Sequence, residues 1–528
     1  MKQSVRLTID GREIQVSVGM TVLEAARAAG IEIPTLCHQD GIAPRTSCFL
    51  CAVRVDGHEN LQPACAALVR EGMAVTTDSA EIAKARRTAL ELLYSDHAGM
   101  CVAPCVTACP ARLDAPRFIR EIRRGDLRAA IAVVKERLPL PAVLGRVCAA
   151  HCEAPCERRR VDESISIRLL HRYAADADLA SPSPYLPGKR PATGKRVAIV
   201  GAGPAGLSAA WFLLQEGHAC DLFDSAPQPG GCLRRLPRDV LDEGALGSEI
   251  GVILQLGARF HGGWTLRSED SFDELRRRHD AVLLAFGASS GASDNERRVG
   301  TDLLERLGFE VTQKGVSVDG ETGATNREGV FAAGEVVTGP SSVVRAVAAG
   351  REVAVSIAQY LRGETVKGPE KLLYFRRGRP LDEEAEILYG NVTRAARAAA
   401  TAAGLAPEGA RHEADRCLQC SCAKENDCKL RRYGAEYGAR PHRFGGERRA
   451  LDPDASHPEI VYEPGKCILC GLCLAIAEEA GESRGLSFAG RGFATRVVAP
   501  LGGNLSEGLE KAARQCAEAC PTAALSRK

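Results

Sequence analysis

The sequence predicts a multidomain protein of mixed α+β and α/β class. Three observations support this: the length of 528 residues, a regular alternation of strand and helix patterns over 195–365, and 21 cysteines that gather in short separate stretches. A chain of this length exceeds a single domain of roughly 100–200 residues. With 45% hydrophobic and 26% charged residues, its composition is that of a globular protein.

The overall charge and hydropathy exclude two classes of partner. The formal net charge of +2 argues against a nucleic-acid surface. No apolar run approaches the ~18–20 residues of a membrane span. The first residues, MKQSVRLTIDG, lack the apolar core of a signal peptide and are typical of a strand. We therefore expect a soluble cytoplasmic protein without a membrane span.

The cysteines indicate metal binding, because thiols without a secretion signal stay reduced. Only Cys220 and Cys232 stand apart from the groups. The groups hold four cysteines in 37–65, three in 101–109, three in 148–156, four in 417–428, three in 467–473 and two in 516–520.

Residues 1–80 predict a small domain with one cluster. Two alternating strands meet at Asp10-Gly11, a hairpin signal, and Thr21 caps an amphipathic helix. The wide spacing C-x10-C-x2-C-x13-C follows, which is similar to plant-type [2Fe–2S] ferredoxins. The segment resembles the N-terminal domain of the large iron–sulfur subunit of NADH dehydrogenase and of iron hydrogenases. This implies a β-grasp domain with one [2Fe–2S] cluster; a structural zinc site is the alternative. The ligands would be Cys37, Cys48, Cys51 and Cys65.

Residues 81–180 predict a helical domain with two cysteine segments, HAGMCVAPCVTACPARLD and GRVCAAHCEAPCERR. These segments resemble the N-terminal domain of the glutamate synthase small subunit and of dihydropyrimidine dehydrogenase, which holds two [4Fe–4S] clusters. The resemblance implies a non-cysteine ligand, and His97 and His171 stand at suitable positions. Each histidine is otherwise a solvated or capping residue. One cluster would take His97, Cys101, Cys105 and Cys156, and the other Cys109, Cys148, Cys152 and His171.

A Pro/Gly/Ser-rich linker over 181–194 leads to an α/β domain over 195–365 that opens with a dinucleotide fingerprint. KRVAIVGAGPAGLSAAWFLLQEGHACDLFD reads strand, G-x-G-x-x-G, helix and strand. In this motif Gly201 makes the tight turn, Gly203 admits the pyrophosphate and Gly206 lets the helix pack on the strand. Pro204 and Ala205 open that helix, whose N-terminus favours phosphate. Asp224 ends the second strand, where an acid binds a ribose hydroxyl.

The fingerprint alone does not separate FAD from NAD. The segments PQPGGCLRRLPR and TNREGVFAAGE, however, resemble flavin-binding segments of the glutamate synthase small subunit. The resemblance implies FAD, with Glu335 where the family has Asp, and the helix SSVVRAVAAGREVAVSIAQYL closing the flavin site. It adds Gly230, Gly231, Arg234, Gly287, Gly334 and Glu335 to the cofactor-binding residues.

The nicotinamide domain of that family has no counterpart in the sequence. It would follow the strand that ends at Gly287, but 287–311 is shorter than the ~30 residues of a βαβ unit. We find no second G-x-G-x-x-G.

The last part of the chain predicts a linker with an Ala-rich helix near 393–404 (366–410), a cysteine segment (411–445) and a ferredoxin-like module (446–528). In the segment, Cys417, Cys420, Cys422 and Cys428 would encircle one [4Fe–4S] cluster or one zinc. In the module, C-x2-C-x2-C with a distant Cys-Pro is typical of a [4Fe–4S] cluster. Its ligands would be Cys467, Cys470, Cys473 and Cys520, leaving Cys516 as a spare thiol.

Together these modules predict an oxidoreductase: an electron-transfer subunit with FAD, one [2Fe–2S] and about four [4Fe–4S] clusters. No residues suggest a catalytic acid–base pair or nucleophile. Expected partners are a catalytic subunit (formate dehydrogenase, aldehyde oxidoreductase or hydrogenase type), a nicotinamide-binding subunit and ferredoxin. The alternatives are a self-sufficient NAD(P)H-dependent reductase and a redox sensor or scaffold.

Overall fold

The computed structural model describes residues 4–287, 302–370, 386–387, 389–424, 427–445, 449 and 451–528. These divide into two compact units. Unit 1 holds the chain up to Val102, the described part of 371–392, and Ser421–Lys528. Unit 2 holds Ala103–Glu370 and Thr393–Cys420. Unit 2 is therefore inserted into the chain of unit 1, and 288–301 lies outside the described residues.

The N-terminal part of unit 1 is a five-stranded sheet in the order β2-β1-β5-β3-β4. The hairpin turn has left-handed backbone at Asp10 and Gly11, with φ of 49° and 75°. Thr21 caps α1 (Val22–Ala28) through a capping box with Glu24. The predicted hairpin and cap are thus confirmed. The strands are β1 (Ser4–Ile9), β2 (Arg12–Ser17), β3 (Ala52–Val55), β4 (Gln62–Pro63) and β5 (Met73–Thr76).

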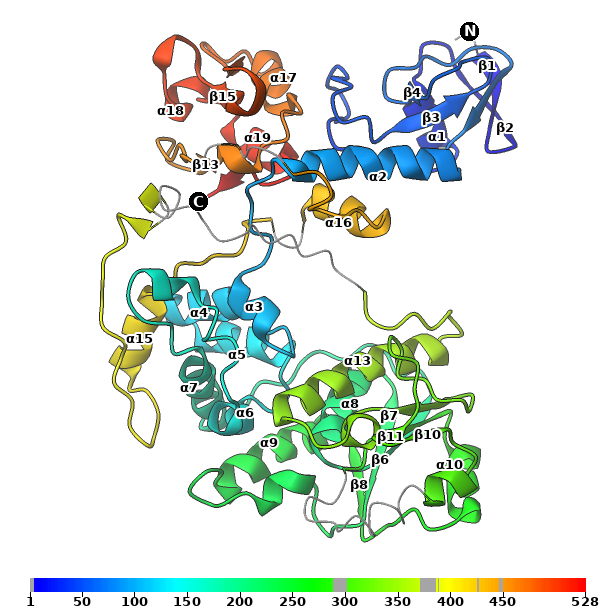
Figure 1. Ribbon diagram of the computed structural model, residues 1–528, viewed down its shortest axis with the longest axis vertical. Coiled ribbons are helices and arrows are strands. Elements are labelled where there is room, and N and C mark those ends of the chain that lie inside the picture. Colours follow the sequence, from blue (N-terminus) through cyan, green and yellow to red (C-terminus); the bar gives the residue numbers. More distant parts are fainter. Residues whose placement is uncertain are drawn as a thin grey trace. The chain divides into compact units, whose positions relative to one another are not determined.

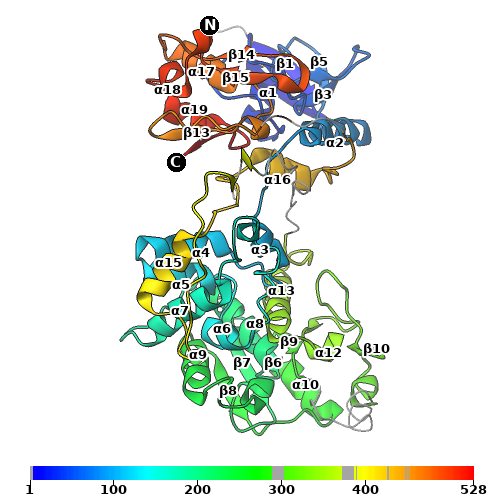
Figure 2. The same cartoon turned by 60° about the vertical axis from the view of Figure 1, so that its left-hand side comes forward.

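Two helices far apart in sequence pack together in unit 1. The first is α2 (Ala80–Ser95) and the second is α16 (Lys429–Glu436) (Figure 2). The Tyr94 hydroxyl donates to the Leu430 carbonyl at 2.9 Å, and the Arg86 guanidinium donates to the Tyr437 hydroxyl at 3.0 Å. These bonds bring the segment around Cys428 to the end of α2.

The C-terminal module of unit 1 surrounds its own small core. Strand β13 (Ile460–Tyr462) pairs with β16 (Leu525–Arg527), and β14 (Ser487–Ala489) pairs with β15 (Arg496–Val498), both antiparallel. Buried Ile476 and Leu509 lie in the core. The helices are α17 (Leu472–Glu479), α18 (Leu505–Gly508) and α19 (Ala513–Ala519).

Unit 2 begins with a run of short helices. Gly125, with φ of 80°, ends α4, and the Asp126 carboxylate caps α5 by accepting from the backbone N–H of Ala129. The elements are α3 (Pro104–Ala108), α4 (Ala115–Arg124), α5 (Leu127–Lys135), α6 (Pro141–Val147), the 3₁₀ turn Glu157–Arg160 and α7 (Ile167–Leu179).

The rest of unit 2 is built on a five-stranded parallel sheet in the order β12-β9-β6-β7-β8 (Figure 1). Helix α8 (Pro204–Gln215) packs against α13 (Val343–Leu361), the helix predicted to close the flavin site. Among the residues described, no helix has both the length and the apolar composition for crossing a membrane. The strands are β6 (Arg196–Val200), β7 (Ala219–Asp224), β8 (Arg259–Gly262), β9 (Ala281–Leu284) and β12 (Val330–Ala332).

Smaller elements complete this domain: α9 (Glu243–Gln255), α10 (Glu269–Arg278), α12 (Glu335–Thr338) and the 3₁₀ turn Gly231–Arg235. Between β9 and β12, the described residues include the antiparallel pair β10 (Val311–Thr312) and β11 (Gly315–Val316).

The prediction of a helix near 393–404 is wrong. These residues carry no helix, and the helix of this region is α15 (Pro407–Asp415). The physical reason is competition for the backbone N–H groups. Those of Ala395, Arg397 and Ala398 donate to side-chain carboxylates rather than to carbonyls one turn earlier.

Candidate functional site

The first candidate site is the turn between β6 and α8. Gly201 has φ of 111°, and a Cβ there would lie 2.5 Å from the backbone nitrogen of Phe286. Gly203 is the N-cap of α8 in extended conformation, and a Cβ there would meet nothing within 4 Å. Pro204 takes the first helical position. This leaves open space above a helix N-terminus, as a phosphate group requires.

Helix α8, which follows this turn, packs so closely at two glycines that no side chain fits there. A Cβ on Gly206 would lie 1.9 Å from the Gly201 carbonyl oxygen. A Cβ on Gly350 of α13 would lie 2.1 Å from the carbonyl oxygen of Ala205. The sequence analysis did not identify Gly350, although a glycine inside a helical pattern is a signal of close packing.

Asp224 stands at the end of β7, beside this turn. Its carboxylate accepts from the backbone N–H of Ala202 at 2.7 Å and from that of Ala226 at 2.9 Å. A carboxylate offers about four lone-pair sites, so two such bonds leave capacity for a ribose hydroxyl.

The other predicted cofactor residues surround the same turn. A Cβ on Gly231 would lie 2.9 Å from Gly203 Cα, and one on Gly334 would lie 3.0 Å from Ala205 Cβ. A Cβ on Gly287 would lie 3.1 Å from the Glu335 carboxylate. The Arg234 guanidinium donates to the Pro229 carbonyl at 2.6 Å, one residue before Gly230. The structure thus brings all the predicted cofactor residues to one cradle.

The second candidate feature is a set of buried or half-buried thiols. Among the residues that the structure describes, no three His, Cys, Asp or Glu side chains are close enough to share one metal ion. This spacing does not conflict with an iron–sulfur cluster, whose ligands are spread over several irons. Burial and neighbouring thiolates raise the pKa of most of these thiols, as the following groups show, and a bound cationic centre would reverse that effect.

Cys37, Cys48, Cys51 and Cys65 form the first group, and all four are buried. The Cys51 and Cys65 sulfurs lie 3.4 Å apart. A hydrogen bond from Cys48 lowers the pKa of Cys37 to about 5. The Arg86 guanidinium holds the intervening loop by donating to the carbonyls of Leu50 and Ala52 at 3.1 and 3.0 Å. The predicted first ligand set is therefore brought together.

The C-terminal group lines one pocket together with Tyr462 and Pro521. The backbone N–H of Leu469 donates to the Cys467 sulfur, and that of Leu525 to the Cys520 sulfur, both at 3.4 Å. Hydrogen bonds to sulfur tune the potential of a cluster. The cysteines of this pocket are Cys467, Cys470, Cys473, Cys516 and Cys520.

A third group in unit 1 differs from the predicted grouping. The charges of Cys101 and Cys422 add to burial in raising the pKa of Cys428 to about 12. The backbone N–H of Cys422 donates to the Cys101 carbonyl at 3.3 Å. Cys101 thus neighbours Cys422 and Cys428, which the sequence analysis had placed with Cys417 and Cys420.

His97 lies close to this third group. Its ring meets that of Tyr94 edge-on at 6.3 Å, and the charges of Cys101 and Cys428 contribute, after burial, to raising the Tyr94 pKa. Burial lowers the pKa of His97 to about 4. The imidazole is therefore neutral, the form that binds metal.

The fourth group lies in unit 2 and joins two distant segments. After burial, the charges of Cys417, Cys156 and Cys420 raise the pKa of Cys105 well above its usual value. Burial, and after it the charge of Cys156, raises the pKa of Cys417 to about 11. Cys417 and Cys420 therefore neighbour Cys105 and Cys156, and the compact units separate them from Cys422 and Cys428.

The fifth group is Cys109, Cys148 and Cys152. After burial, the charges of Cys109 and Cys148 contribute to raising the pKa of Cys152. His171 lies on α7, which packs against α6, the helix that Cys148 ends. The His171 Nδ1 is buried without a hydrogen-bond partner among the described residues, and burial lowers its pKa to about 4.

Within unit 1 the first group contacts the C-terminal group. The Ser47 hydroxyl, beside Cys48, donates to the Cys470 carbonyl at 3.3 Å. The charge of Cys37 adds to the raised pKa of Cys470. The Arg45 guanidinium pairs with Glu478 of α17 at 3.6 Å. Spacing in sequence gives no signal of this contact.

Lys424 connects the third group to the C-terminal group. Its ammonium donates to the carbonyls of Cys520 and Glu518 at 2.6 and 2.9 Å. The backbone N–H of Lys429 donates to Pro521 at 3.1 Å. Lys424 and Lys429, which stand beside Cys422 and Cys428 in the sequence, therefore contact the backbone at Cys520 and Pro521 in the neighbouring group.

Comparisons with known protein families match four parts of the chain. Residues 2–80 match a 2Fe-2S iron–sulfur cluster binding domain, and 76–182 match dihydropyrimidine dehydrogenase domain II, a 4Fe-4S cluster domain. Residues 199–275 match an NAD(P)-binding Rossmann-like domain. Residues 460–526 match a 4Fe-4S single cluster domain.

Three relatives each cover about a third of the chain. The chain is 36% identical over 195 residues to the NADPH-Fe(3+) oxidoreductase subunit beta of Geobacter sulfurreducens, covering 35% of this chain and 28% of that protein. It is 36% identical over 212 residues to the NADP(+)-dependent formate dehydrogenase subunit beta of Moorella thermoacetica, covering 35% and 29%. It is 34% identical over 185 residues to the glutamate synthase [NADPH] small chain of Bacillus subtilis, covering 34% and 37%.

The chain thus spans less than two fifths of the length of each of these relatives. The resemblance to the glutamate synthase small subunit is confirmed. The chain is accordingly similar to that subunit and to the beta subunits named above, and it combines matches to a 2Fe-2S domain, two 4Fe-4S domains and a Rossmann-like domain in one polypeptide.

Proposed function

We propose that this protein is an electron-transfer subunit of a multi-subunit oxidoreductase, which carries electrons between a catalytic partner and a second acceptor through FAD and five iron–sulfur clusters. The observation that carries the proposal is the combination of a dinucleotide cradle with five groups of buried or half-buried thiols in one chain. FAD exchanges electrons in pairs or singly, whereas iron–sulfur clusters exchange them one at a time.

The proposed cofactor is FAD, and the cradle supports its binding. The open space above Gly203 suits a pyrophosphate, and Asp224 has acceptor capacity for a ribose hydroxyl. Glu335, close to Gly287, would lie beside the rest of the flavin. Together these residues would bind and orient the dinucleotide at the carboxyl ends of β6, β7 and β9, where ligands of parallel sheets bind.

The thiol groups support a revised assignment of ligands. The first group would hold a [2Fe–2S] cluster and the other four would hold [4Fe–4S] clusters. In unit 1 the clusters would use the first group, the C-terminal group without Cys516, and His97 with Cys101, Cys422 and Cys428. In unit 2 they would use Cys105, Cys156, Cys417 and Cys420, and then Cys109, Cys148, Cys152 and His171.

The contacts inside unit 1 support a continuous path. Ser47 links the first group to Cys470, and Lys424 links Cys520 to the third group. Electrons would therefore pass from the [2Fe–2S] site to the C-terminal cluster and then to the cluster at His97. The proposed catalytic partner is a subunit of the formate dehydrogenase, aldehyde oxidoreductase or hydrogenase type. The proposed second partner is ferredoxin or a nicotinamide-binding subunit.

A second candidate is a self-sufficient NAD(P)H-dependent reductase. The match of 199–275 to a family described as NAD(P)-binding favours it. Against it stands the sequence: residues 287–311 are fewer than the ~30 residues of a βαβ unit, and the chain holds no second G-x-G-x-x-G. The third sequence-based possibility, a redox sensor or scaffold, predicts a chain that is stable alone, whereas a relay subunit co-purifies with a catalytic partner.

The deciding experiment is an anaerobic titration of the purified, reconstituted chain with NADH and then NADPH, following flavin absorbance. We expect no bleaching by either nucleotide and full reduction by dithionite, which points to a partner as the electron source. Rapid stoichiometric bleaching by NADH or NADPH would overturn the proposal in favour of the self-sufficient reductase.

A further inference from the structure

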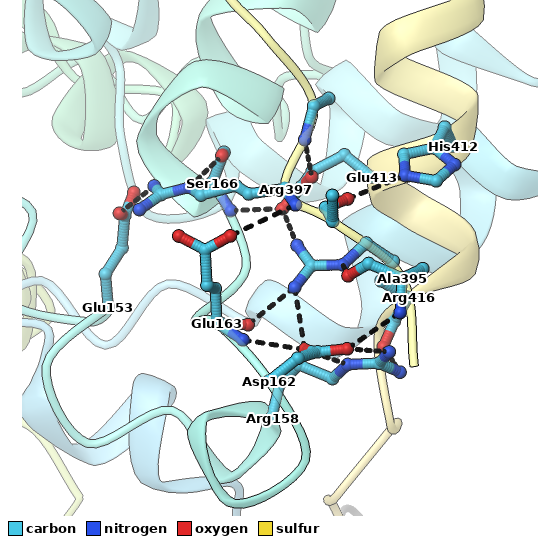
Figure 3. A network of polar contacts seen from close by, with 12 residues as sticks. Glu153, Arg158, Asp162, Glu163, Ser166, Ala395, Arg397, His412, Glu413 and Arg416 are labelled. Carbon is cyan, nitrogen blue, oxygen red and sulfur yellow. Dashed lines mark hydrogen bonds and ion pairs between the residues drawn. The ribbon is translucent and has the colours of Figure 1, made fainter. Parts of the chain in front are cut away.

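An ionic network around the buried side chains of Arg158, Glu413 and Arg416 joins two distant segments of unit 2, residues 153–166 and 393–416 (Figure 3). The first segment contains Cys156, and the second ends immediately before Cys417. The network consists of Glu153, Arg158, Asp162, Glu163, Ser166, Ala395, Arg397, Glu413 and Arg416.

Arg158 reaches from the first segment to the backbone of the second. It stands two residues after Cys156 and is 3% exposed. Its guanidinium donates to the Arg416 carbonyl at 3.0 Å and to the Thr393 carbonyl at 2.7 Å. It also forms a two-pronged pair with Asp162, which fixes its orientation.

Arg416 makes the reciprocal connection. It is 3% exposed and lies directly before Cys417. Its guanidinium donates to Asp162 at 2.8 Å, to the Glu163 carbonyl at 2.7 Å and to Glu413 at 2.7 Å. A fourth bond, to the Ala395 carbonyl at 3.1 Å, holds the second segment in its non-helical path. Four bonds thus fix the residue beside a cysteine of the fourth group.

The carboxylates of the network also accept several hydrogen bonds each. Glu413 is fully buried, and its oxygens accept from the backbone N–H groups of Ser166 at 2.8 Å and Ala398 at 2.9 Å. Asp162 accepts from the backbone N–H of Ala395 at 3.0 Å. At the centre of the network the charges of Arg158 and Arg416 balance those of Asp162 and Glu413, so removing one leaves a buried charge without its partner.

We infer that this network is a positioning device that holds Cys417 and Cys420 beside Cys105 and Cys156, so that the four thiolates can hold one [4Fe–4S] cluster. The inference rests on the ligand assignment in the proposed function. Cys417 reaches the group from a segment more than 200 residues beyond Cys156, and residues 393–406 form no helix or extended strand. Fixing such a segment costs conformational entropy, which the network's bonds offset.

The test uses the full-length protein, purified anaerobically, with iron, sulfide and flavin counted per chain. Arg416→Gln should lose about four irons, the content of one cubane, while flavin and the remaining clusters stay. Arg416→Lys should not restore them, because an ammonium cannot reproduce the planar fork of donors. Cys417→Ser sets the reference for complete loss of this cluster.

Two matched controls separate positioning from general damage. Arg411→Gln removes an exposed arginine from the same helix, α15, and should leave the iron content unchanged. Asp178→Asn breaks another buried ion pair of unit 2, the one with Lys135 at 2.7 Å. It should retain all the irons, because the bonds of Asp178 go to Arg128, Lys135 and Tyr185 and not to the segment that carries Cys417.

The outcomes are distinguishable. If Cys417→Ser loses four irons but Arg416→Gln keeps them with an unchanged EPR spectrum, the inference is overturned and the ligand assignment stands. If Cys417→Ser loses none, the ligand assignment fails and this inference fails with it. Equal iron loss in Asp178→Asn and Arg416→Gln would also overturn the inference. If Arg416→Gln does not fold as a flavoprotein, iron, sulfide and flavin are counted instead in Asp162→Asn, which preserves the size of the side chain.

Discussion

The guanidinium of Arg158 donates a 3.0 Å hydrogen bond to the backbone carbonyl of Arg416. Cys156 stands two residues before the donor, and Cys417 directly follows the acceptor. A bond between two residues more than 250 positions apart therefore brings together two thiols that the sequence analysis had given to different clusters. The buried charges around this bond lead to a first prediction about stability.

Asp162→Asn should lower the free energy of unfolding of unit 2 by about 3–5 kcal/mol, the cost of leaving buried arginines without their carboxylate. Hydrogen bonds from Arg158 hold the pKa of Asp162 well below its usual range. Because folding lowers this pKa, the ionised carboxylate stabilises the fold fully at every pH above the ordinary pKa of about 3.9. This stabilisation is lost as the pH falls from that value through the lower pKa of the folded state. Urea unfolding followed by flavin fluorescence should give equal differences between variant and wild type at pH 6 and pH 8. A difference that changed between these two values would contradict the assignment to Asp162.

Two glycines of the cradle should respond differently to alanine. A Cβ at Gly206 would lie 1.9 Å from the Gly201 carbonyl oxygen, so Gly206→Ala should destabilise even the flavin-free protein. A Cβ at Gly203 meets no protein atom within 4 Å, so Gly203→Ala should leave that stability nearly unchanged. It should nevertheless weaken flavin binding, because the methyl group occupies the space of the pyrophosphate. Thermal unfolding of both apoproteins and flavin titration separate the two effects. Normal flavin affinity in Gly203→Ala would contradict this location of the pyrophosphate.

The sequence was sufficient for features that depend on local spacing. The hairpin at Asp10-Gly11, the cap at Thr21 and the strand–turn–helix around Gly203 follow from short-range backbone and capping preferences. The 2Fe-2S domain and the C-terminal 4Fe-4S domain follow from cysteine spacing, and the helical 4Fe-4S domain follows from its resemblance to a known family; the family matches confirm all three.

The sequence failed where distant segments interact. Cys417, Cys420, Cys422 and Cys428 lie within twelve positions, so spacing groups them, yet two belong to each compact unit. The alanines near 393–404 favour a helix by intrinsic propensity. Tertiary bonds override this preference, since the carboxylates of Asp162 and Glu413 take the backbone N–H groups that a helix would use.

Cys470→Ser should remove about four irons and leave the flavin bound, because Cys470 is one of four proposed ligands in the C-terminal pocket. Cys516 provides the control, since it lines the same pocket but is proposed as a spare thiol. Cys516→Ala should keep the full iron content. Iron and flavin analysis of both variants checks the pair. Unchanged iron in Cys470→Ser, or a four-iron loss in Cys516→Ala, would reverse their roles.

His171→Ala should change the EPR signal or the reduction potential of one cluster in unit 2. The Nδ1 atom of His171 is buried without a hydrogen-bond partner among the described residues, as a free ligand atom would be. Imidazole in place of thiolate removes negative charge and raises the potential of a cluster, so losing it alters both properties. His151→Ala, which changes an exposed histidine one residue before Cys152, is the matched control. Identical spectra and redox titrations for His171→Ala and wild type would show that His171 is not a ligand.

Lys424→Gln should lower the reduction potential of the C-terminal cluster. The Lys424 ammonium donates to the Cys520 carbonyl at 2.6 Å, so its positive charge lies beside a proposed ligand. A cluster gains negative charge on reduction, and a nearby cation stabilises the reduced form. A unit charge about 10 Å away at an effective dielectric constant near 20 contributes about 1–2 kcal/mol, which corresponds to ~40–80 mV for one electron.

An EPR-monitored redox titration measures this shift, with two variants for comparison. Lys424→Arg keeps the charge and should stay close to the wild-type potential. Lys511→Gln removes a lysine of the same module that donates to the Gly481 carbonyl at 2.7 Å, away from the proposed ligands, and should cause no shift. Equal potentials in Lys424→Gln and Lys511→Gln would mean that Lys424 only caps the end of α19. A shift confined to Lys424→Gln would instead place its charge on the path between the C-terminal cluster and the one at His97, where it sets the driving force for each electron that passes.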